Sequence, residues 1–333
     1  GDIMTMASSG TPTFSYIQGY RTFFQNGGVQ LGTGGFTDIT NAIVAGTTNV
    51  GTRDTSSTNL TIPTGGTLEA EAKTHTVSGD LKMSGGLIGK SALVFDGTGD
   101  VVNCGTDSDL NITSGGLTYE CWVKDDGKDN TSWRYLDKGT VVWLGGDSGT
   151  HGGAVTDSVV RFVVYNGTDG NNILLGNTYI DDGKWHHIAG VLESDGKTMK
   201  IYVDGKLDAT RVNTTANPAS SSNKLVLGGY DDGSGGYVGS FDGTMARASV
   251  WSTPLTQAQI RARMFSDFAG LDSNTGCVGW WQFDEGSGAS VDNKGSAGAD
   301  ADGTIVNATW AGAAGLDDGT STIDLTGNGT WYI

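Results

Sequence analysis

The chain has 333 residues and a net charge of −17, and it contains 55 Gly but only 4 Pro. The acidic balance excludes nucleic acid as a partner, because phosphate binding needs clustered Lys and Arg. No apolar stretch approaches the ~18 residues of a membrane-spanning helix, so membrane insertion is also excluded. Abundant Gly without Pro or a three-residue period excludes collagen and favours short strands joined by tight turns.

The chain has 37 acidic residues, and almost all of them are Asp. The Glu residues are Glu69, Glu71, Glu120, Glu193 and Glu285. Asp prefers turns, whereas Glu favours helices, so we expect the acids in loops and few long helices. Clustered loop carboxylates can bind Ca²⁺, and dispersed ones simply keep a β protein soluble.

Residues 1–85 are polar and rich in Thr and Gly, with alternating runs such as LTI, TLEAEA, THTVSG and DLKMSG. They predict short strands that become stable by stacking, as in a solenoid, or by pairing with another chain. The C-terminal segment STIDLTGNGTWYI has the same polar, Thr- and Gly-rich composition with short alternating runs. We therefore predict an N-terminal extended β arm for assembly or anchoring over 1–85 and a second arm within a C-terminal β extension, 271–333. Flexible tails are the alternative.

Residues 86–270 alternate strand-like runs with Gly/Asp turns, among them VVRFVVY, HHIAGVL and MKIYVDG. One short helix is expected in TQAQIRARMFSDF, which Thr256 would cap. This pattern predicts an all-β protein, an antiparallel β-sandwich of the jelly-roll type with extended β arms at both ends and one short helix. The three cysteines, Cys104, Cys121 and Cys277, form no CxxC or zinc pattern. The sequence is compatible with one disulfide and with no disulfide.

Five segments of this region together resemble the laminin-G-like, concanavalin A-like jelly-roll domain, in its pentraxin-related variant. They occur in the order of that family and span about half of the chain: SALVFDGTGDVV (91–102), LTYECWVK (117–124), DDGKWHHIAGVLESDGKTMKIYVDGKL (181–207), KLVLGG (224–229) and FDGTMARASVWSTPLTQAQI (241–260). Residues 276–310 look like the strand pair that often precedes this domain in the family. Here they follow it, either adding edge strands to this roll or beginning a truncated neighbour.

The most specific of these motifs indicate fold rather than chemistry. His186 and His187 are adjacent on one predicted strand, so they point to opposite faces and do not easily bind one ion. Asp204 and Gly205 form the most favoured two-residue hairpin turn.

The resemblance implies a Ca²⁺ near the loop after the first strand and near the last strand. Asp96 and Asp100 flank the glycines of FDGTGD, and Asp242, Asp231 and Asp232 lie in FDG and YDDG. These five residues are our candidate metal ligands. The alternative is that each Asp accepts backbone N–H bonds in a turn.

Carbohydrate binding is the usual role of such rolls, and it needs aromatic faces with planar polar side chains. The candidate residues on strands or loops that could line the concave face are Trp133, Tyr135, Trp143, Arg161 and Tyr230. The alternative is that Trp143 and its neighbours are core. Catalysis is disfavoured, since the chain contains no ExDxE, GxSxG, HExxH or P-loop motif.

These patterns favour a non-catalytic structural or surface protein of an assembled particle, such as a virion decoration, fibre or tail component, on the extracellular or virion surface. Residues 1–85 and 311–333 would bind copies of the chain or other particle subunits, and the roll would display a glycan- or receptor-binding surface. The alternatives are a secreted bacterial calcium-assisted lectin or adhesion module, or an accessory module of a glycoside hydrolase.

Overall fold

The computed structural model describes residues 88, 91–125, 132–148, 158–168, 171–264 and 266–311, and the backbone of eight short strands between residues 22 and 83. The chain divides into two compact units, one of residues 88–314 and one that contains the eight N-terminal strands. No helix in these described ranges is long and apolar enough to cross a membrane.

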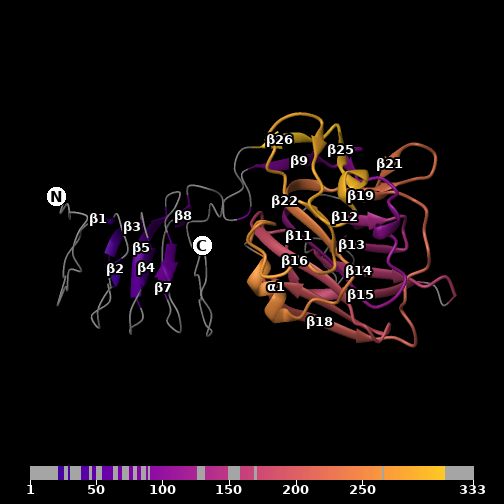
Figure 1. Ribbon diagram of the computed structural model, residues 1–333, viewed down its shortest axis with the longest axis horizontal. Coiled ribbons are helices and arrows are strands. Elements are labelled where there is room, and N and C mark those ends of the chain that lie inside the picture. The colour runs from indigo at the N-terminus through magenta and orange to yellow at the C-terminus, as the bar shows by residue number, and fades with distance from the viewer. Residues whose placement is uncertain are drawn as a thin grey trace. The chain divides into compact units, whose positions relative to one another are not determined.

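The N-terminal strands pair in parallel with strands one turn further along the chain (indigo arrows in Figure 1). Their bounds are β1 Thr22–Gln25, β2 Val29–Gln30, β3 Ile39–Val44, β4 Thr47–Asn49, β5 Thr55–Ile62, β6 Thr67–Glu69, β7 His75–Val77 and β8 Leu81–Met83. The odd-numbered strands and β8 form one sheet, and β2, β4 and β6 form another. This alternation between two parallel sheets is that of a β-solenoid.

The second unit is a sandwich of two eight-stranded antiparallel sheets (Figure 1), which confirms the predicted jelly roll. The front sheet has the order β15-β14-β13-β12-β19-β10-β25-β24, and the back sheet has the order β18-β17-β16-β11-β22-β9-β26, with β23 paired to β22. The bounds of these strands are β9 Ala92–Asp96, β10 Val101–Asn103, β11 Leu117–Asp125, β12 Ser132–Lys138, β13 Val142–Asp147, β14 Val159–Tyr165, β15 Asn171–Tyr179, β16 Trp185–Leu192, β17 Thr198–Val203, β18 Lys206–Val212, β19 Leu225–Leu227, β22 Asp242–Trp251, β23 Cys277–Trp281, β24 Ser290–Val291, β25 Gly303–Val306 and β26 Thr309–Ala311.

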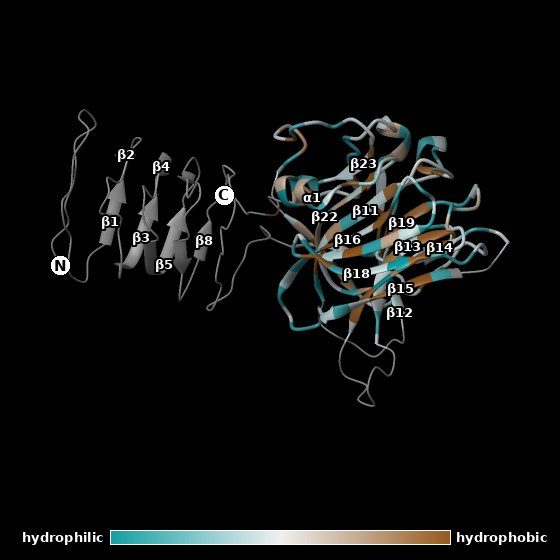
Figure 2. Ribbon diagram, turned by 90° about the horizontal axis from the view of Figure 1, so that it is seen from below, coloured by the Kyte–Doolittle hydropathy of each residue, from teal (hydrophilic) through white to brown (hydrophobic). Residues whose placement is uncertain are grey.

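The core lies between the two sheets and is filled by inward side chains that alternate along most of the strands. Figure 2 shows hydrophobic (brown) segments on strands of the roll. Phe162 on β14 reaches the back sheet at Gly190 on β16, where a Cβ atom would lie 2.5 Å from the Phe162 ring. The core depends on a glycine at this position, because any side chain there would displace the aromatic ring. Cys104, Cys121 and Cys277 are buried free thiols.

The segment after residue 276 adds strands to both sheets. Strand β23 pairs with β22, β25 pairs with β10, and β26 pairs with β9. In the back sheet, β9 is the first strand along the chain and β26 is the last. These two strands are neighbours, with Leu93 opposite Trp310.

The side chains of Asp208 and Arg211 join the edge strands β18 and β15 of the two sheets. The Asp208 carboxylate on β18 accepts hydrogen bonds from the backbone N–H of Asn177 at 2.6 Å and from the Thr178 hydroxyl at 2.7 Å. Arg211 on β18 donates to the carbonyl of Ile173 on β15. Edge groups that could pair with another chain are occupied in this way.

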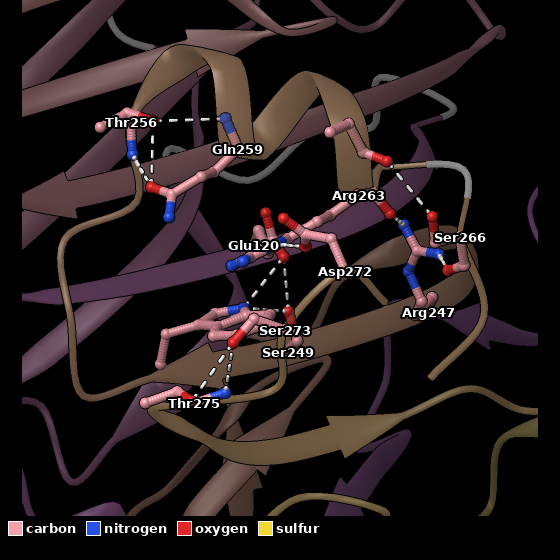
Figure 3. A network of polar contacts seen from close by, with 12 residues as sticks. Glu120, Arg247, Ser249, Thr256, Gln259, Arg263, Ser266, Asp272, Ser273 and Thr275 are labelled. Carbon is pink, nitrogen blue, oxygen red and sulfur yellow. Dashed lines mark hydrogen bonds and ion pairs between the residues drawn. The ribbon is translucent and has the colours of Figure 1, made fainter. Parts of the chain in front are cut away.

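Helix α1, Gln257–Arg263, covers the outer face of the back sheet (Figure 3). As predicted, Thr256 caps it: the Thr256 hydroxyl accepts from the Gln259 N–H, and the Gln259 side chain accepts from the Thr256 N–H. Below the helix, Ile260 packs in a buried cluster with Trp251 and Trp280, whose rings meet edge to face at 6.3 Å.

Candidate functional site

Two arginines and one tryptophan form a cluster on the outer face of the front sheet. Arg134 on β12 and Arg161 on β14 both lie in register with Gly145 on β13. Because Gly145 has no side chain, nothing in that row separates the two arginines. Trp143 lies two residues away on β13, on the same face of the pleated sheet.

The guanidinium of Arg134 covers the indole of Trp143, with Cζ 3.3 Å from the ring centroid. Arg161 lies at 5.0 Å from the same centroid, and Arg134 lies 5.2 Å from the ring of Tyr230 on β20, Tyr230–Asp231. Trp143 is consequently only 4% exposed. A ligand on this face would therefore contact the guanidinium edges and Tyr230 before it contacted the indole. We name Arg134, Trp143, Arg161 and Tyr230 the arginine–aromatic cluster.

Two carboxylates hold the arginines in place. Arg134 Nε lies 3.2 Å from Asp137 Oδ2, and Arg161 donates to Asp147 Oδ2 at 2.6 Å. Burial raises the pKa of Asp137 to about 6, although the Thr140 N–H and Arg134 act in the opposite direction. Burial also lowers the pKa of Arg134, against the charge of Asp137. At neutral pH the pair is ionised and keeps the guanidinium over Trp143.

One nitrogen of the Arg161 guanidinium, Nε, is buried without a hydrogen-bond partner in the described part of the chain. A buried donor without an acceptor costs free energy, so this position favours an incoming oxygen atom from water or from a ligand.

Three of the five predicted carbohydrate-binding residues meet in this cluster: Trp143, Arg161 and Tyr230. Trp133 and Tyr135 instead point into the core, where both donate to the same carboxylate oxygen of Asp125. Trp133 and Tyr135 face inward on either side of the outward Arg134, as ordinary alternation along β12 requires, and the β-bulge after Arg134 adds Leu136 to the same inner face. Arg134 was missed, although its position between two inward aromatic residues on a strand predicts an outward side chain.

Three of the predicted metal ligands are close together at the end of β9. Asp96 lies opposite Asp242 on β22, and Asp100 follows one turn later. The Asp96 N–H donates to Asp100 Oδ2 at 2.9 Å, and the Thr98 N–H donates to Asp96 Oδ1 at 2.8 Å. Burial raises the pKa of Asp100, and the charges of Asp96 and Asp242 add to this shift.

The other two predicted ligands lie in a separate turn. Asp231 is 2.8 Å from Lys224 Nζ, and Asp232 accepts from the N–H groups of Ser234 and Gly236. Across the described residues, no group of three His, Cys, Asp or Glu side chains is arranged to hold a metal ion. Asp96 Oδ1 and Asp100 Oδ2 instead accept hydrogen bonds from backbone N–H groups.

The two adjacent histidines have separate environments, as their positions predict. His186 lies between Asp204, 2.9 Å from Nδ1, and Asp182, 3.1 Å from Nε2. Burial alone would lower the pKa of His186, but these two carboxylates outweigh it and raise the pKa. His187 is buried below α1, where desolvation and Arg247 hold its pKa well below the usual range.

A second polar network lies below helix α1 (Figure 3). The Glu120 carboxylate on β11 accepts from the Ser249 hydroxyl at 2.8 Å and from the Trp251 indole N–H at 3.0 Å. Arg247 donates to the carbonyls of Met264 and Ser266, at the end of α1. Glu120 is only 3% exposed, so this network positions the helix rather than facing a ligand.

The family comparison agrees with this architecture. Residues 96–261 match the Concanavalin A-like lectin/glucanases superfamily, in its laminin-G group. The roll therefore belongs to this superfamily, as the five sequence segments predicted.

Individual relatives are distant. A rat protein, "Sushi, von Willebrand factor type A, EGF and pentraxin domain-containing protein 1", is 28% identical over 114 residues, which are 32% of this chain and 3% of that protein. A Bacteroides ovatus protein assigned to carbohydrate binding has a TM-score of 0.53 at 18% identity, covering 73% of this chain and 63% of its own. A heptameric SAP-like pentraxin from Limulus polyphemus has a TM-score of 0.40 at 16% identity, covering 52% and 81% of the two chains. The chain thus spans less than two thirds of the first two relatives.

Proposed function

We propose that the roll is a non-catalytic glycan-binding domain and that the arginine–aromatic cluster is its binding surface. The observation that carries this proposal is the juxtaposition of Arg134 and Arg161 beside Tyr230, with the Arg161 Nε donor lacking a partner among the described residues. Sugar hydroxyls accept hydrogen bonds from planar guanidinium groups, and the apolar face of a sugar ring packs on an aromatic ring. The assignment of the Bacteroides ovatus protein to carbohydrate binding supports the same function.

We expect the cluster residues to decide glycan affinity. Wild-type protein is screened on an array of neutral and acidic glycans, and the strongest binder is titrated by calorimetry. Arg134→Gln and Arg161→Gln each remove charged donors, so each should weaken binding about tenfold or more, equivalent to ~1.5–3 kcal/mol. Arg211→Gln is the matched control, since Arg211 is an exposed arginine on β18 of the other sheet and should leave affinity unchanged. No binding of wild-type protein at millimolar glycan, or full binding by the double variant R134Q/R161Q, contradicts the proposal.

The absence of catalysis is part of this proposal. Glu120 is enclosed below α1, and Asp137 is fully buried against Arg134, so neither acid reaches the surface of the cluster. Glycoside hydrolysis needs two carboxyl groups on either side of an accessible sugar bond.

We further propose that the chain works at the surface of an assembled particle, extracellular or on a virion, with the N-terminal strands as the assembly element. The parallel pairing of β1–β8 supports this, because parallel stacks leave free strand edges at their ends. A secreted lectin, an adhesion module and an accessory module of a glycoside hydrolase use the same binding surface without assembly. A monodisperse monomer in size-exclusion chromatography would favour these alternatives.

Calcium binding at Asp96, Asp100 and Asp242 is a second proposal. The mutual repulsion that helps to raise the pKa of Asp100 supports it, because a cation would relieve that repulsion. These carboxylates would need to turn away from their backbone partners in order to bind Ca²⁺.

The expected result is a rise in the melting temperature of wild-type protein with millimolar Ca²⁺, and no rise in the variant D96N/D100N. The binding free energy adds to stability only where the ion is held by the folded state. D231N/D232N is the matched control and should keep the full shift. An identical melting temperature with Ca²⁺ and with EDTA would remove calcium from the proposed function.

A further inference from the structure

The β-bulge in β12 puts two oppositely charged side chains on one face of the front sheet. Residues three apart on a regular strand point to opposite faces, because side chains alternate. The register of β12 on β13 shifts between Arg134 and Leu136, and after this shift Asp137 lies opposite Trp143. Arg134 and Asp137 therefore share the outer face with Trp143, and the bulge makes their ion pair possible.

The Asp137 carboxylate makes one contact with each of its oxygen atoms. Oδ2 lies 3.2 Å from Arg134 Nε, and Oδ1 accepts from the backbone N–H of Thr140 at 2.7 Å. The Asp137 side chain is only 1% exposed, so water hardly competes for these contacts. The same Arg134 guanidinium covers Trp143, with Cζ 3.3 Å from the ring centroid. Asp137 thus fixes the position of the side chain that covers the indole.

The turn after β12 depends on the same carboxylate. Thr140 has a φ of 64°, in the left-handed region that a β-branched residue rarely adopts. Such a conformation persists where the surrounding contacts impose it, and it is concentrated at ligand sites. The hydrogen bond from the Thr140 N–H to Asp137 is a contact of this kind.

The charge of Asp137 responds to mild acid. Burial raises its pKa to about 6, although the Thr140 N–H and Arg134 act in the opposite direction. The carboxyl group is therefore ionised above about pH 6 and neutral below it. A neutral carboxyl group no longer forms an ion pair with the guanidinium, so its hold on Arg134 weakens.

The other groups that face this pair lie on neighbouring strands. Arg161 on β14 lies 5.0 Å from the Trp143 ring, and Tyr230 on β20 lies 5.2 Å from Arg134. On β11, at the inner side of the sheet, burial raises the pKa of Tyr119, and the Asp137 charge adds to this shift. The partner of Asp137 on β19 is the uncharged Val226, and Asp147 is held by Arg161. Asp137 is thus the acid in direct contact with Arg134.

We propose that Asp137 is the positioning residue of the arginine–aromatic cluster and that its protonation weakens glycan binding in mild acid. With the carboxylate ionised, Arg134 is held against Trp143 in the position in which it meets the ligand. With the carboxyl group neutral, binding must first order the guanidinium again, which costs affinity. This inference rests on the proposed glycan site, but the hold of Asp137 on Arg134 can be measured without a glycan.

The pH profile of affinity tests the proposal. A glycan whose own charge is constant between about pH 5 and about pH 7.5 is titrated by calorimetry into wild-type protein. We expect the affinity to fall about five- to tenfold from the higher to the lower pH, with a midpoint near about 6, because ~90% of such a carboxyl group is protonated at about pH 5. By linkage, glycan binding near the midpoint should release a proton.

Two variants identify the titrating group. Asp137→Asn keeps an oxygen for the Thr140 N–H but has no charge for Arg134. At about pH 7.5, D137N should bind as weakly as wild-type protein does at about pH 5, and its affinity should not change with pH. Asp125→Asn is the matched control, since Asp125 is a buried acid that contacts Tyr135 on the core side of the same strand. D125N should keep the affinity and the pH profile of wild-type protein.

A measurement without glycan separates this inference from the proposed function. We expect solvent exchange of the Arg134 Nε–H, followed by NMR at one pH, to be at least about tenfold faster in D137N than in wild-type protein. Equal exchange in the two proteins overturns the proposal, whether or not a glycan binds. Glycan affinity that is unchanged or higher in acid also overturns it, and leaves the binding surface intact. Slow exchange in a protein that binds no glycan removes the glycan site and its pH effect, and retains Asp137 as the residue that positions Arg134.

Discussion

Replacing Arg247 by Met is expected to lower the free energy of unfolding of the roll by about 3–5 kcal/mol, the usual cost of breaking a buried charge pair by removing one partner. Burial lowers the pKa of Arg247 to about 10, so the side chain is charged at neutral pH. Its guanidinium donates to the carbonyls at the end of α1 and lies 4.7 Å from the ring of Trp280. Without it, those carbonyls lose their donor, and Glu120 remains buried without the charge that opposes its raised pKa.

Chemical denaturation of the purified chain measures this loss. Arg261→Met is the matched control, since Arg261 is a partly exposed arginine on α1 itself, and its replacement should cost less than about 1 kcal/mol. The double variant R247M/E120Q should recover part of the loss, because the remaining buried charge is then neutral. Equal stability of R247M and R261M would show that the network does not hold the helix to the sheet.

Replacing Asp125 by Ala is expected to cost about 2–6 kcal/mol, since each of two buried donors then loses its acceptor at ~1–3 kcal/mol. The donors are the Trp133 indole N–H, at 2.9 Å from Asp125 Oδ2, and the Tyr135 hydroxyl. Asp125 is 1% exposed, so water cannot replace it without opening the core.

Asp125→Asn is the control, because its carbonyl oxygen still accepts, and its cost should be well below that of D125A. The same experiment separates core from surface: D125N and Tyr135→Phe should leave glycan affinity unchanged, whereas R134Q should not. If Y135F lost as much glycan affinity as R134Q, the result would show that Tyr135 contributes to the binding surface.

Much of the roll could be predicted from local patterns. The alternation of apolar residues in runs such as VVRFVVY predicts a strand with one buried face. Thr256 in TQAQIRAR predicts the start of a helix. The order of strands in the two sheets could not be derived from such patterns, because pairing between β9 and β26 joins segments more than 200 residues apart. The family resemblance predicted the jelly roll, but it left open whether residues 276–310 add strands to this roll.

The candidate cluster combines residues that the sequence analysis named with one, Arg134, that it did not name. Trp143, Arg161 and Tyr230 were identified by residue type, and their meeting depends on sheet register. Trp133 and Tyr135 share the face of β12 opposite Arg134, and alternation alone does not show which of the two faces of a strand points into the core. The Asp residues were predicted to cluster or to cap turns, and the described contacts are largely of the second kind.

The pairing of the first and last strands of the roll has a mechanical consequence. A pull on the chain segments on either side of the roll acts at Ala92 and Ala311, which are opposite one another. Because the strands are antiparallel, such a load separates their hydrogen bonds pair by pair from that end instead of shearing all of them together. Strand β26 would detach first, while the core between the sheets carries none of the initial force.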